Sequence, residues 1–517
     1  MFRIPVTSEF FYEDEAMKIV FKKCIVMLIG VLVTLQLAGC VSSEKYYEDV
    51  GLSREAAFRQ WESRKERQER SQPVISGKLN IADCTKLALV NNKVLQSIVQ
   101  EREVARGERL KSYSAILPKV NLTGDYTRFD EVTSFEIDTP TGKEKIQFGD
   151  EDNYSTVLMV TQPIYAGGSI PARINAAKLM TLLTDETVRA AVQDMVYAAE
   201  HAYFDVLLSQ HLLEISTDAV RSAQAHLDNV KQRQRGGVAA DFDVLRAEVE
   251  LSNFQAEFIQ NKNAINVAKA NLIKVMGVSQ DSDFVLSDEL LYVPSNITME
   301  QAVEAAYRNR PDLIGREFDI KMQKELLNVA RSQYFPVVSG YYSNTWAKPD
   351  PHSMMAIEWG HAWQGGITAS VPIFDGFMRD GQIVAQKARL KQGQIDLIDA
   401  EETALFELTK AQLGIENTAE FIESQQLNLT RAEEGLRLAG VGYREGTNTQ
   451  VEMIDAQSAL TTARANHYQA VYAHIIAKLD FQKAMGTLAS VETAESEGQA
   501  RIESGNAEEN TPIALVE

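Results

Sequence analysis

The chain has 517 residues, 45% hydrophobic and 8% aromatic, which is too apolar a composition for an intrinsically disordered protein. Its formal net charge of −20 argues against nucleic acid as a partner, because phosphate binding requires a basic surface. Of the three cysteines only Cys40 and Cys84 would remain after removal of an N-terminal signal, and lipidation of Cys40 would leave Cys84 unpaired. A disulfide framework is therefore not expected.

The N-terminus has the composition of a targeting signal. Three lysines follow Met17, a candidate start, and precede an apolar run over residues 24–38, which is shorter than the roughly 20 residues of a membrane-spanning helix. The run ends in Leu37-Ala38-Gly39-Cys40, which resembles the lipobox of bacterial lipoproteins. We expect residues 1–39 to be removed and Cys40 to be lipidated; the alternative is a chance cysteine after an ordinary signal peptide. By resemblance to lipoprotein sorting, Val41 favours the outer membrane.

Residues 40–78 are polar and mixed in charge, which predicts an exposed extension or a short helix. A first helix is then expected from the helical spacing of Leu87, Leu95 and Ile98. Pro118 ends it, because proline lacks a backbone donor and disfavours helix in the residue before it.

Four strands with alternating patterns are expected, in two pairs. The first pair is predicted over about 119–129 and 154–162, and the second over about 337–346 and 363–371. In the first strand Val120, Leu122, Gly124 and Tyr126 share one face, and polar residues share the other. Each strand has about ten residues, the length needed to cross a bilayer at a tilt of about 45°.

A very long helix is expected after each strand pair. Residues 169–235 have no glycine and no proline after Pro171, which predicts a helix of about 100 Å at 1.5 Å per residue. The matching stretch over 378–444 contains several glycines that weaken it. Helices of this length must pack against others, and each is predicted to turn at glycine and return, to Met276 and to Met485.

The two halves of the chain are repeats of one unit of about 200 residues. Pro118 recurs as Pro336, 218 positions later, whereas Pro163 recurs as Pro372, 209 positions later. Only the segment between the two prolines therefore changes length. We expect a first repeat over 79–277, a linker over 278–296, a second repeat over 297–486 and an acidic disordered tail over 487–517.

These segments resemble the outer-membrane efflux protein family, the TolC-like outer-membrane factors. Three features carry the resemblance: residues 297–313, echoed at 79–95; Gln162-Pro163-Ile164-Tyr165 with Gly167-Gly168; and residues 235–248, echoed at 444–457. Each motif is weak alone, but their order, repeated twice, is specific. Together they cover about residues 79–486, and the lipobox is typical of the drug-efflux branch.

The resemblance implies a mainly α fold with a membrane β-barrel part. Four strands cannot close a barrel, and open sheet edges are not tolerated in lipid. The family implies a homotrimer, with a 12-stranded β-barrel in the outer membrane that continues into a periplasmic α-helical barrel. Such a protein is a passive exit duct for small toxic compounds or drugs, working with a periplasmic adaptor (membrane fusion) protein and an inner-membrane pump, most often of the RND type. The alternative is the outer-membrane component of a type I protein secretion system.

The family resemblance also assigns site residues. Arg235, Gly236, Gly237 and Val238 at one helical turn, and Arg444, Gly446 and Thr447 at the other, are predicted to contact the adaptor, although each segment would also serve as a plain capped turn. Val451 and Asp455 match the periplasmic gate, and three copies of Asp455 would form an acidic ring. The basic partner found three residues later in some members is Ser458 here, and Asp455 would otherwise be a solvated helical position. Asp241 and Asp243 are weaker gate candidates.

No enzymatic site is predicted. Phosphate-binding glycine loops, nucleophile elbows and HExxH are absent from the sequence, and the histidines have no convincing set of metal-ligand neighbours. No cofactor and no metal are therefore expected. A structural coiled-coil lipoprotein without a pore remains a competing hypothesis, but such a scaffold would not need four strands of bilayer-spanning length.

Overall fold

The computed structural model describes residues 43–67, 73–140, 142–294, 297–353 and 356–488. It divides into two compact units, Met1–Pro73 and Val74–Glu517. In the first unit the described part is α2 (Ser43–Arg67), a helix of 25 residues with almost entirely exposed side chains. The predicted extension is thus one long helix rather than a short one. The signal segment, Cys40 and residues 489–517 lie outside the described residues.

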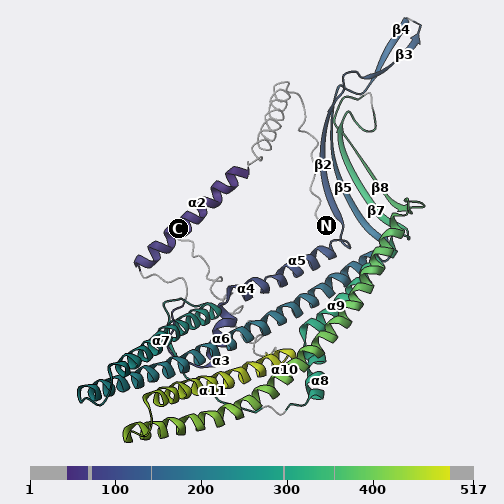
Figure 1. Cartoon of the computed structure of the whole chain (residues 1–517). Coiled ribbons are helices and arrows are strands. Elements are labelled where there is room, and N and C mark those ends of the chain that lie inside the picture. Colours follow the sequence, from purple (N-terminus) through teal and green to yellow (C-terminus); the bar gives the residue numbers. More distant parts are fainter. Residues whose placement is uncertain (1–42, 68–72, 141, 295–296, 354–355, 489–517) are drawn as a thin grey trace, which may run out of the picture. The chain divides into compact units, whose positions relative to one another are not determined.

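Four long helices make up about half of the described part of the second unit (Figure 1). The hairpin of the first repeat is α6 (Ser169–Arg235) with α7 (Asp241–Met276), and that of the second is α10 (Met378–Glu445) with α11 (Gln450–Ala484). The long helices predicted over 169–235 and 378–444 are confirmed to within one residue. Contacts join α7 to α6, α6 to α11, and α11 to α10. The helices therefore lie in the order α7–α6–α11–α10, with α7 and α10 at the two edges.

Shorter helices lead from the start of each repeat to its strands, three in the first repeat and two in the second. In the first repeat they are α3 (Ile81–Asn91), α4 (Lys93–Val99) and α5 (Glu101–Tyr113), where the sequence predicted one continuous helix. In the second they are α8 (Met299–Asn309) and α9 (Pro311–Ser332). Breaks occur because Asn92 caps α4 with its side chain and Pro311 occupies the first turn of α9.

The predicted strands form one antiparallel sheet in the order β2–β5–β7–β8. These are β2 (Lys119–Arg128), β5 (Asp152–Ala166), β7 (Val337–Lys348) and β8 (Gly360–Ser370). Three of the strands, β5, β7 and β8, are longer than predicted. The outer strands β2 and β8 each leave one edge without a partner strand in the described chain.

Residues paired across this sheet give it two chemically different faces. Leu122 pairs with Leu158, and Tyr126 with Tyr154, so one face is apolar across β2 and β5. The same face continues through Tyr342 and Trp363, whose rings stack at 6.2 Å. The opposite face carries polar side chains, among them Thr123, Asp125, Ser155, Ser343 and Gln364.

Two pairs of strands were not predicted. The antiparallel hairpin of β3 (Thr133–Thr139) and β4 (Gly142–Phe148) fills the segment interpreted as a polar connection. This hairpin extends beyond the four-stranded sheet (Figure 1) and belongs to the segment that is longer in the first repeat. The parallel pair of β1 (Ser76–Leu79) and β6 (Asp283–Leu286) places a strand inside the predicted linker 278–296.

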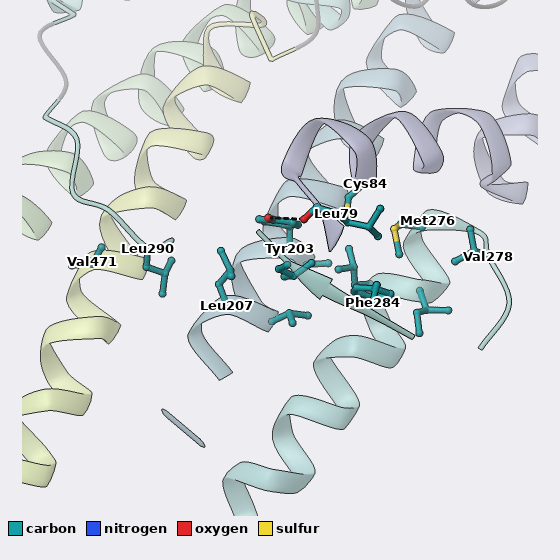
Figure 2. Packing of buried hydrophobic residues seen from close by; sticks show 14 of the residues in the cluster. Leu79, Cys84, Tyr203, Leu207, Met276, Val278, Phe284, Leu290 and Val471 are labelled. Carbon is teal, nitrogen blue, oxygen red and sulfur yellow. Dashed lines mark hydrogen bonds between the residues drawn. The ribbon is translucent and has the colours of Figure 1, made fainter. Parts of the chain in front are cut away.

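The largest core lies where this small parallel pair packs between helices. Figure 2 shows Tyr203 of α6 among Leu79, Cys84, Met276 and Phe284, all buried. The Tyr203 hydroxyl donates to Asp288 at 2.7 Å, which satisfies its buried polar group. Burial raises the pKa of the Cys84 thiol to about 12, so this free cysteine is an inert core residue.

Candidate functional site

The first predicted site is the turn between α6 and α7. Gly237 adopts a left-handed conformation with φ of +75°, and the Val238 amide donates to the Arg233 carbonyl at 2.9 Å, so the end of α6 is closed by its own backbone. At the start of α7 the Asp243 carboxylate accepts from the Ala240 amide at 3.0 Å. Arg235, Gly236 and Val238 are exposed. Their side chains and backbone are therefore free to meet another protein.

The second predicted site is the turn between α10 and α11. Gly446 is left-handed with φ of +79°, and both the amide and the hydroxyl of Thr447 donate to the Gly442 carbonyl, at 2.9 and 3.1 Å. Thr449 and Glu452 form a reciprocal capping box at the start of α11. Arg444, Gly446 and Thr447 are exposed. The two turns share the same design, an αL glycine followed by an acid-capped return helix.

Two polar contacts hold the turns together, and the sequence did not reveal either. The Arg233 guanidinium donates to the Tyr443 carbonyl at 3.3 Å and stacks over the Tyr443 ring at 4.7 Å. The buried Gln450 amide donates to the Asp243 carbonyl at 2.8 Å. Within the described residues the Gln450 Oε1 atom has no hydrogen-bond partner. The two hairpin ends are therefore joined by few bonds, one of which involves an incompletely satisfied amide.

The predicted gate residues lie one helical turn apart on α11. Val451 is half-buried, whereas Asp455 is exposed and makes no hydrogen bond or ion pair with the described part of the chain. The weaker candidates differ from it. Asp243 caps α7, and Asp241 accepts from the Gln234 side chain at 2.7 Å. Only Asp455 among the three carboxylates is therefore without a structural partner in the described chain.

A hydrogen-bonded cluster between α6 and α11 was also missed. Asp205 accepts from the Tyr472 hydroxyl and lies 3.2 Å from His201 Nδ1, while the Tyr197 hydroxyl donates to Asp480 at 2.7 Å. Burial raises the pKa of Asp205, but hydrogen bonds from His201 and Tyr472 outweigh it and lower the pKa overall. The bond to Asp205 raises the pKa of His201. The cluster ties one hairpin to the other.

Neither region has the arrangement of an enzyme or of a metal centre. No group of three His, Cys, Asp or Glu side chains in the described ranges is close enough to hold a metal ion. The buried His474 is used structurally: its Nδ1 lies 3.0 Å from the Thr418 hydroxyl and its Nε2 lies 3.3 Å from the Val293 carbonyl. None of the helices in the described part of the chain is both long and apolar enough to cross a membrane.

Paired long helical hairpins, each joined to a strand pair with one apolar and one polar face, define a channel fold rather than a catalytic one. The sequence matches the family described as "Outer membrane efflux protein" over residues 85–278 and 302–487, which is more than half of the chain and includes both repeats. The chain belongs to this family of outer membrane efflux channels, which are not enzymes.

Curated relatives with similar sequences include proteins named for efflux and for protein secretion. Outer membrane protein TolC of Vibrio cholerae is 22% identical over 79% of this chain and 91% of its own length. The alkaline protease secretion protein AprF of Pseudomonas aeruginosa is 22% identical over 77% of this chain and 82% of its own. The toluene efflux pump outer membrane protein TtgC of Pseudomonas putida is 21% identical over 80% of this chain and 84% of its own length.

Solved structures share the fold. The CmeC outer membrane channel of Campylobacter jejuni superposes with a TM-score of 0.69 at 16% identity, over 81% of this chain and 88% of its own. CusC, a protein described as forming a transmembrane channel, superposes with a TM-score of 0.67 at 18% identity. The match covers 78% of this chain and 92% of the CusC chain. At these identities the likeness is evidence of the fold alone, which is mainly α with long helices and a small sheet.

Proposed function

We propose that this protein is a passive export channel of the outer membrane, the exit duct of a tripartite system that moves small toxic compounds or drugs out of the cell. An inner-membrane pump of the RND type would supply the energy. A periplasmic adaptor protein would supply the contact between the pump and the channel. The chain would be anchored by a lipid at Cys40, with its long helices in the periplasm. The observation that carries the proposal is the four-stranded sheet with one apolar and one polar face.

The apolar face fits a lipid environment. Leu122, Trp363 and Ile367 are 70%, 69% and 73% exposed in the single chain, which would be unfavourable in water. Thr123, Asp125 and Gln364 on the other face suit a wet interior. Alternation of apolar and polar side chains along each strand is the pattern of a transmembrane barrel.

The free edges of β2 and β8 require further copies of the chain. An unpaired edge in lipid leaves backbone groups without hydrogen bonds, at a cost of several kcal/mol for each group. Three copies of the four-stranded sheet give twelve strands, which is an even number that can close. A homotrimer is therefore proposed, with the α7–α6–α11–α10 layers surrounding a continuous passage.

Efflux of small compounds is favoured over protein secretion. The lipobox at Cys40 is typical of the drug-efflux branch, and one relative is named for toluene efflux. Type I secretion is the second candidate, because another relative, 22% identical against 21%, is named for alkaline protease secretion. Deletion of the gene followed by a toxicity panel separates them. Sensitisation to dyes, detergents or antibiotics supports efflux, and loss of one secreted polypeptide with unchanged tolerance supports secretion.

Channel activity itself can be measured directly. Purified protein in planar bilayers is expected to conduct ions and to show heat-modifiable migration on gels. A purified protein with neither property would support the pore-free scaffold and remove the proposal.

The two helical turns are proposed as the adaptor-contacting end, with Val451 and Asp455 at the gate. The exposed turn residues, Arg235, Gly236, Gly237 and Val238 with Arg444, Gly446 and Thr447, would meet the adaptor. Three symmetry-related Asp455 carboxylates would favour cations and repel one another. Asp455→Ala is expected to leak more ions than wild type in single-channel recordings, and Glu257→Ala, at an exposed carboxylate of α7 away from the turns, is the matched control. Unchanged conductance of Asp455→Ala would remove this residue from the gate.

A further inference from the structure

Each repeat opens with a short helix that packs into an equivalent hydrophobic core. Residues before Pro118 have counterparts 218 positions later, and residues after Pro163 have counterparts 209 positions later. By these shifts the core of α3 and α7 corresponds to the core of α8 and α11. The matched buried residues are Cys84 with Ala302, Leu272 with Phe481, and Met276 with Met485. The surroundings of the two cores can therefore be compared position by position.

Only the first core is covered by the chain that follows its return helix. Beyond Met276, residues 278–290 add four buried side chains to this core: Val278, Phe284, Leu286 and Leu290. Among the described residues, no side chain after Met485 joins the second core. As a result Ile297, the counterpart of Leu79, is 43% exposed, whereas Leu79 is 8% exposed.

The uncovered part of the second core is one face of α8. Met299, Val303 and Tyr307 recur every four residues along this face. Met299 and Val303 pack against the core, while Tyr307 is 46% exposed. They line a groove of about 490 Å³ together with three charged neighbours: Glu300, Glu304 and Arg308. Apolar side chains that stay exposed beside a core favour the burial of a further apolar segment.

A buried polar atom indicates the same missing cover. In the first repeat the Tyr203 hydroxyl donates to Asp288, which belongs to the segment after α7. The counterpart of Tyr203 is Gln412, whose amide donates to Glu416 at 3.0 Å. The Gln412 Oε1 atom is buried and accepts no hydrogen bond from the described part of the chain. The second repeat thus lacks a donor where the first repeat bonds to its covering segment.

The directly equivalent residues of the tail cannot supply an apolar cover. Phe284, Val285 and Leu286 correspond to residues 493–495, which are Thr, Ala and Glu. Beyond Met485 the sequence has one run of four consecutive apolar residues, Ile513-Ala514-Leu515-Val516. Residues 510–512 are uncharged and separate this run from the glutamates before it. The run can therefore approach the groove without bringing those carboxylates beside Glu300 and Glu304.

We propose that residues 513–516 dock on the exposed face of α8 of the same chain, where they cover the second core as residues 278–290 cover the first. Residues 489–512 are the tether. Ile513, Leu515 and Val516 bury their side chains against Val303 and Tyr307. The backbone of the docked segment supplies the donor that Gln412 Oε1 lacks. The contact lies within one chain and is independent of the proposed ring of copies.

The position where the tail begins makes this contact easy to reach. The end of α11 meets the end of α8, because a Cβ atom at Gly486 would lie 2.8 Å from the Asn309 carbonyl carbon. Helix α8 has 11 residues and is about 16 Å long. The 25 residues from Leu488 to Ile513 can span up to about 80 Å. A tethered segment has an effective concentration in the millimolar range, so a few apolar side chains are enough to hold it.

Thiol labelling of the full-length protein tests the cover. Tyr307→Cys places a thiol in the groove, and Leu89→Cys places one at the counterpart position on α3, which the tail does not cover in this proposal. Cys84 is buried and its pKa is raised to about 12, so wild type gives the background. Each thiol is labelled with a maleimide in the intact protein and after deletion of residues 513–516. The double substitution Ile513→Asp with Leu515→Asp is used if the deletion changes the oligomeric state seen by light scattering.

Tyr307→Cys is expected to react at least about tenfold faster once the run is deleted or charged, because an undocked tail leaves the groove open. Leu89→Cys is expected to react at an unchanged rate. Ile502→Asp, at an apolar tail residue outside the run, is the matched control and is expected to leave Tyr307→Cys slow. Equal rates for Tyr307→Cys with and without the run overturn the proposal, whether the groove is then open or covered by a second copy.

A disulfide identifies which chain provides the segment. Tyr307→Cys with Leu515→Cys is expected to form a loop within one chain on oxidation. Such a protein runs as a monomer on non-reducing denaturing gels, and digestion followed by mass spectrometry finds the two peptides joined. Covalent dimers or trimers in place of the loop would mean that the tail docks on a second copy, which overturns the assignment to the same chain.

Discussion

The long helices α6 and α10 occupy equivalent places in the two repeats, yet their surroundings in a single chain differ greatly. They have 67 and 68 residues, but eighteen residues of α6 are buried and only eight of α10. α6 packs against α5, α7, α9 and α11, whereas the principal contacts of α10 are with α8, α9 and α11. Two helices of equivalent length and position thus differ in burial. Other elements of the same chain cover much more of α6 than of α10.

The exposed side chains of the edge helices show what the missing cover must be. On α7 and the turn before it, Val238, Phe242, Leu245 and Val249 recur every three or four residues, and all are more than half exposed. On α10 a second set of apolar side chains is exposed, which includes Val384, Ile395, Ile398, Phe406 and Leu413. An apolar stripe on each edge is what the proposed ring of like copies would require, since the α7 edge of one copy would meet the α10 edge of the next.

The largest expected effect is on the free energy of unfolding, when Gly167 and Gly376, the glycines at the two strand-to-helix junctions, are each replaced. Gly167→Ala is expected to cost about 3 kcal/mol of unfolding free energy, because the new methyl group overlaps the Ser332 carbonyl and the backbone is left-handed. If a second copy covers the other junction, Gly376→Ala costs a similar amount. If that junction is open, it costs only about 1 kcal/mol, from the left-handed backbone. Chemical unfolding of the assembled full-length protein distinguishes the two.

A smaller effect on the free energy of unfolding is expected at Arg310. At this position the two repeats use different residues to bind equivalent backbone carbonyl groups. The Asn92 amide donates to the Val275 carbonyl at 2.9 Å, and its counterpart Arg310 donates to Ala484, the counterpart of Val275, at 3.2 Å. Arg310 also binds Asp312 at 2.8 Å and Glu407 at 2.6 Å. Arg310→Ala is expected to lower the unfolding free energy by about 2–3 kcal/mol, since both carboxylates lose their partner.

Arg310→Asn is the matched variant, because it installs the residue that the first repeat uses. It is expected to recover part of the loss if the bond to the Ala484 carbonyl matters, and none of it if only the ion pairs matter. A midpoint for Arg310→Asn below that of Arg310→Ala in urea unfolding would contradict the equivalence of the two positions.

The sequence predicted the long elements well because their ends have strong local signals. Helix α6 begins after Gly168, which is left-handed, and has Pro171 in its first turn; it ends before the left-handed Gly237. These residues act locally, so no tertiary information is needed to place them. The hairpin β3–β4 was missed although Phe135 and Phe148, which are diagonal neighbours across it, stack at 5.1 Å. Its turn residues were conspicuous, while its alternating pattern is short.

The contacts at the candidate site could not be predicted, because they join residues from different repeats. Gln450 meets the Asp243 backbone from 207 positions away, and Arg233 meets Tyr443 from 210 away. No local spacing encodes such pairs. Tyr197, His201 and Asp205 are spaced by four residues and share one helical face, but their partners Tyr472 and Asp480 lie on α11. The turn residues were assigned only by resemblance, and their roles stay proposals.

The smallest expected effect is on the pH dependence of stability. It distinguishes the α6–α11 contact within the chain from the proposed contact between copies. The hydrogen bond to Asp205 raises the pKa of His201, so this contribution to stability is complete below the ordinary histidine pKa of about 6.5 and is lost as pH rises through the raised value. The lowered pKa of Asp205 makes its contribution complete above about 4. The α6–α11 contact is therefore strongest between about pH 4 and 6.5.

The counterparts of His201 and Asp205 on α10 are Lys410 and Gly414, so no equivalent pair titrates at the proposed contact between copies. His211, His226, His467 and His474 have pKa values lowered by burial and oppose the trend, so the informative quantity is the difference between wild type and His201→Gln. Because the pair is about one-third exposed, this difference is expected to be a few tenths of a kcal/mol at pH 6 and close to zero at pH 9. Thermal unfolding at both pH values measures it. A difference that grows with pH would mean that the neutral ring, and not the imidazolium, holds α6 to α11.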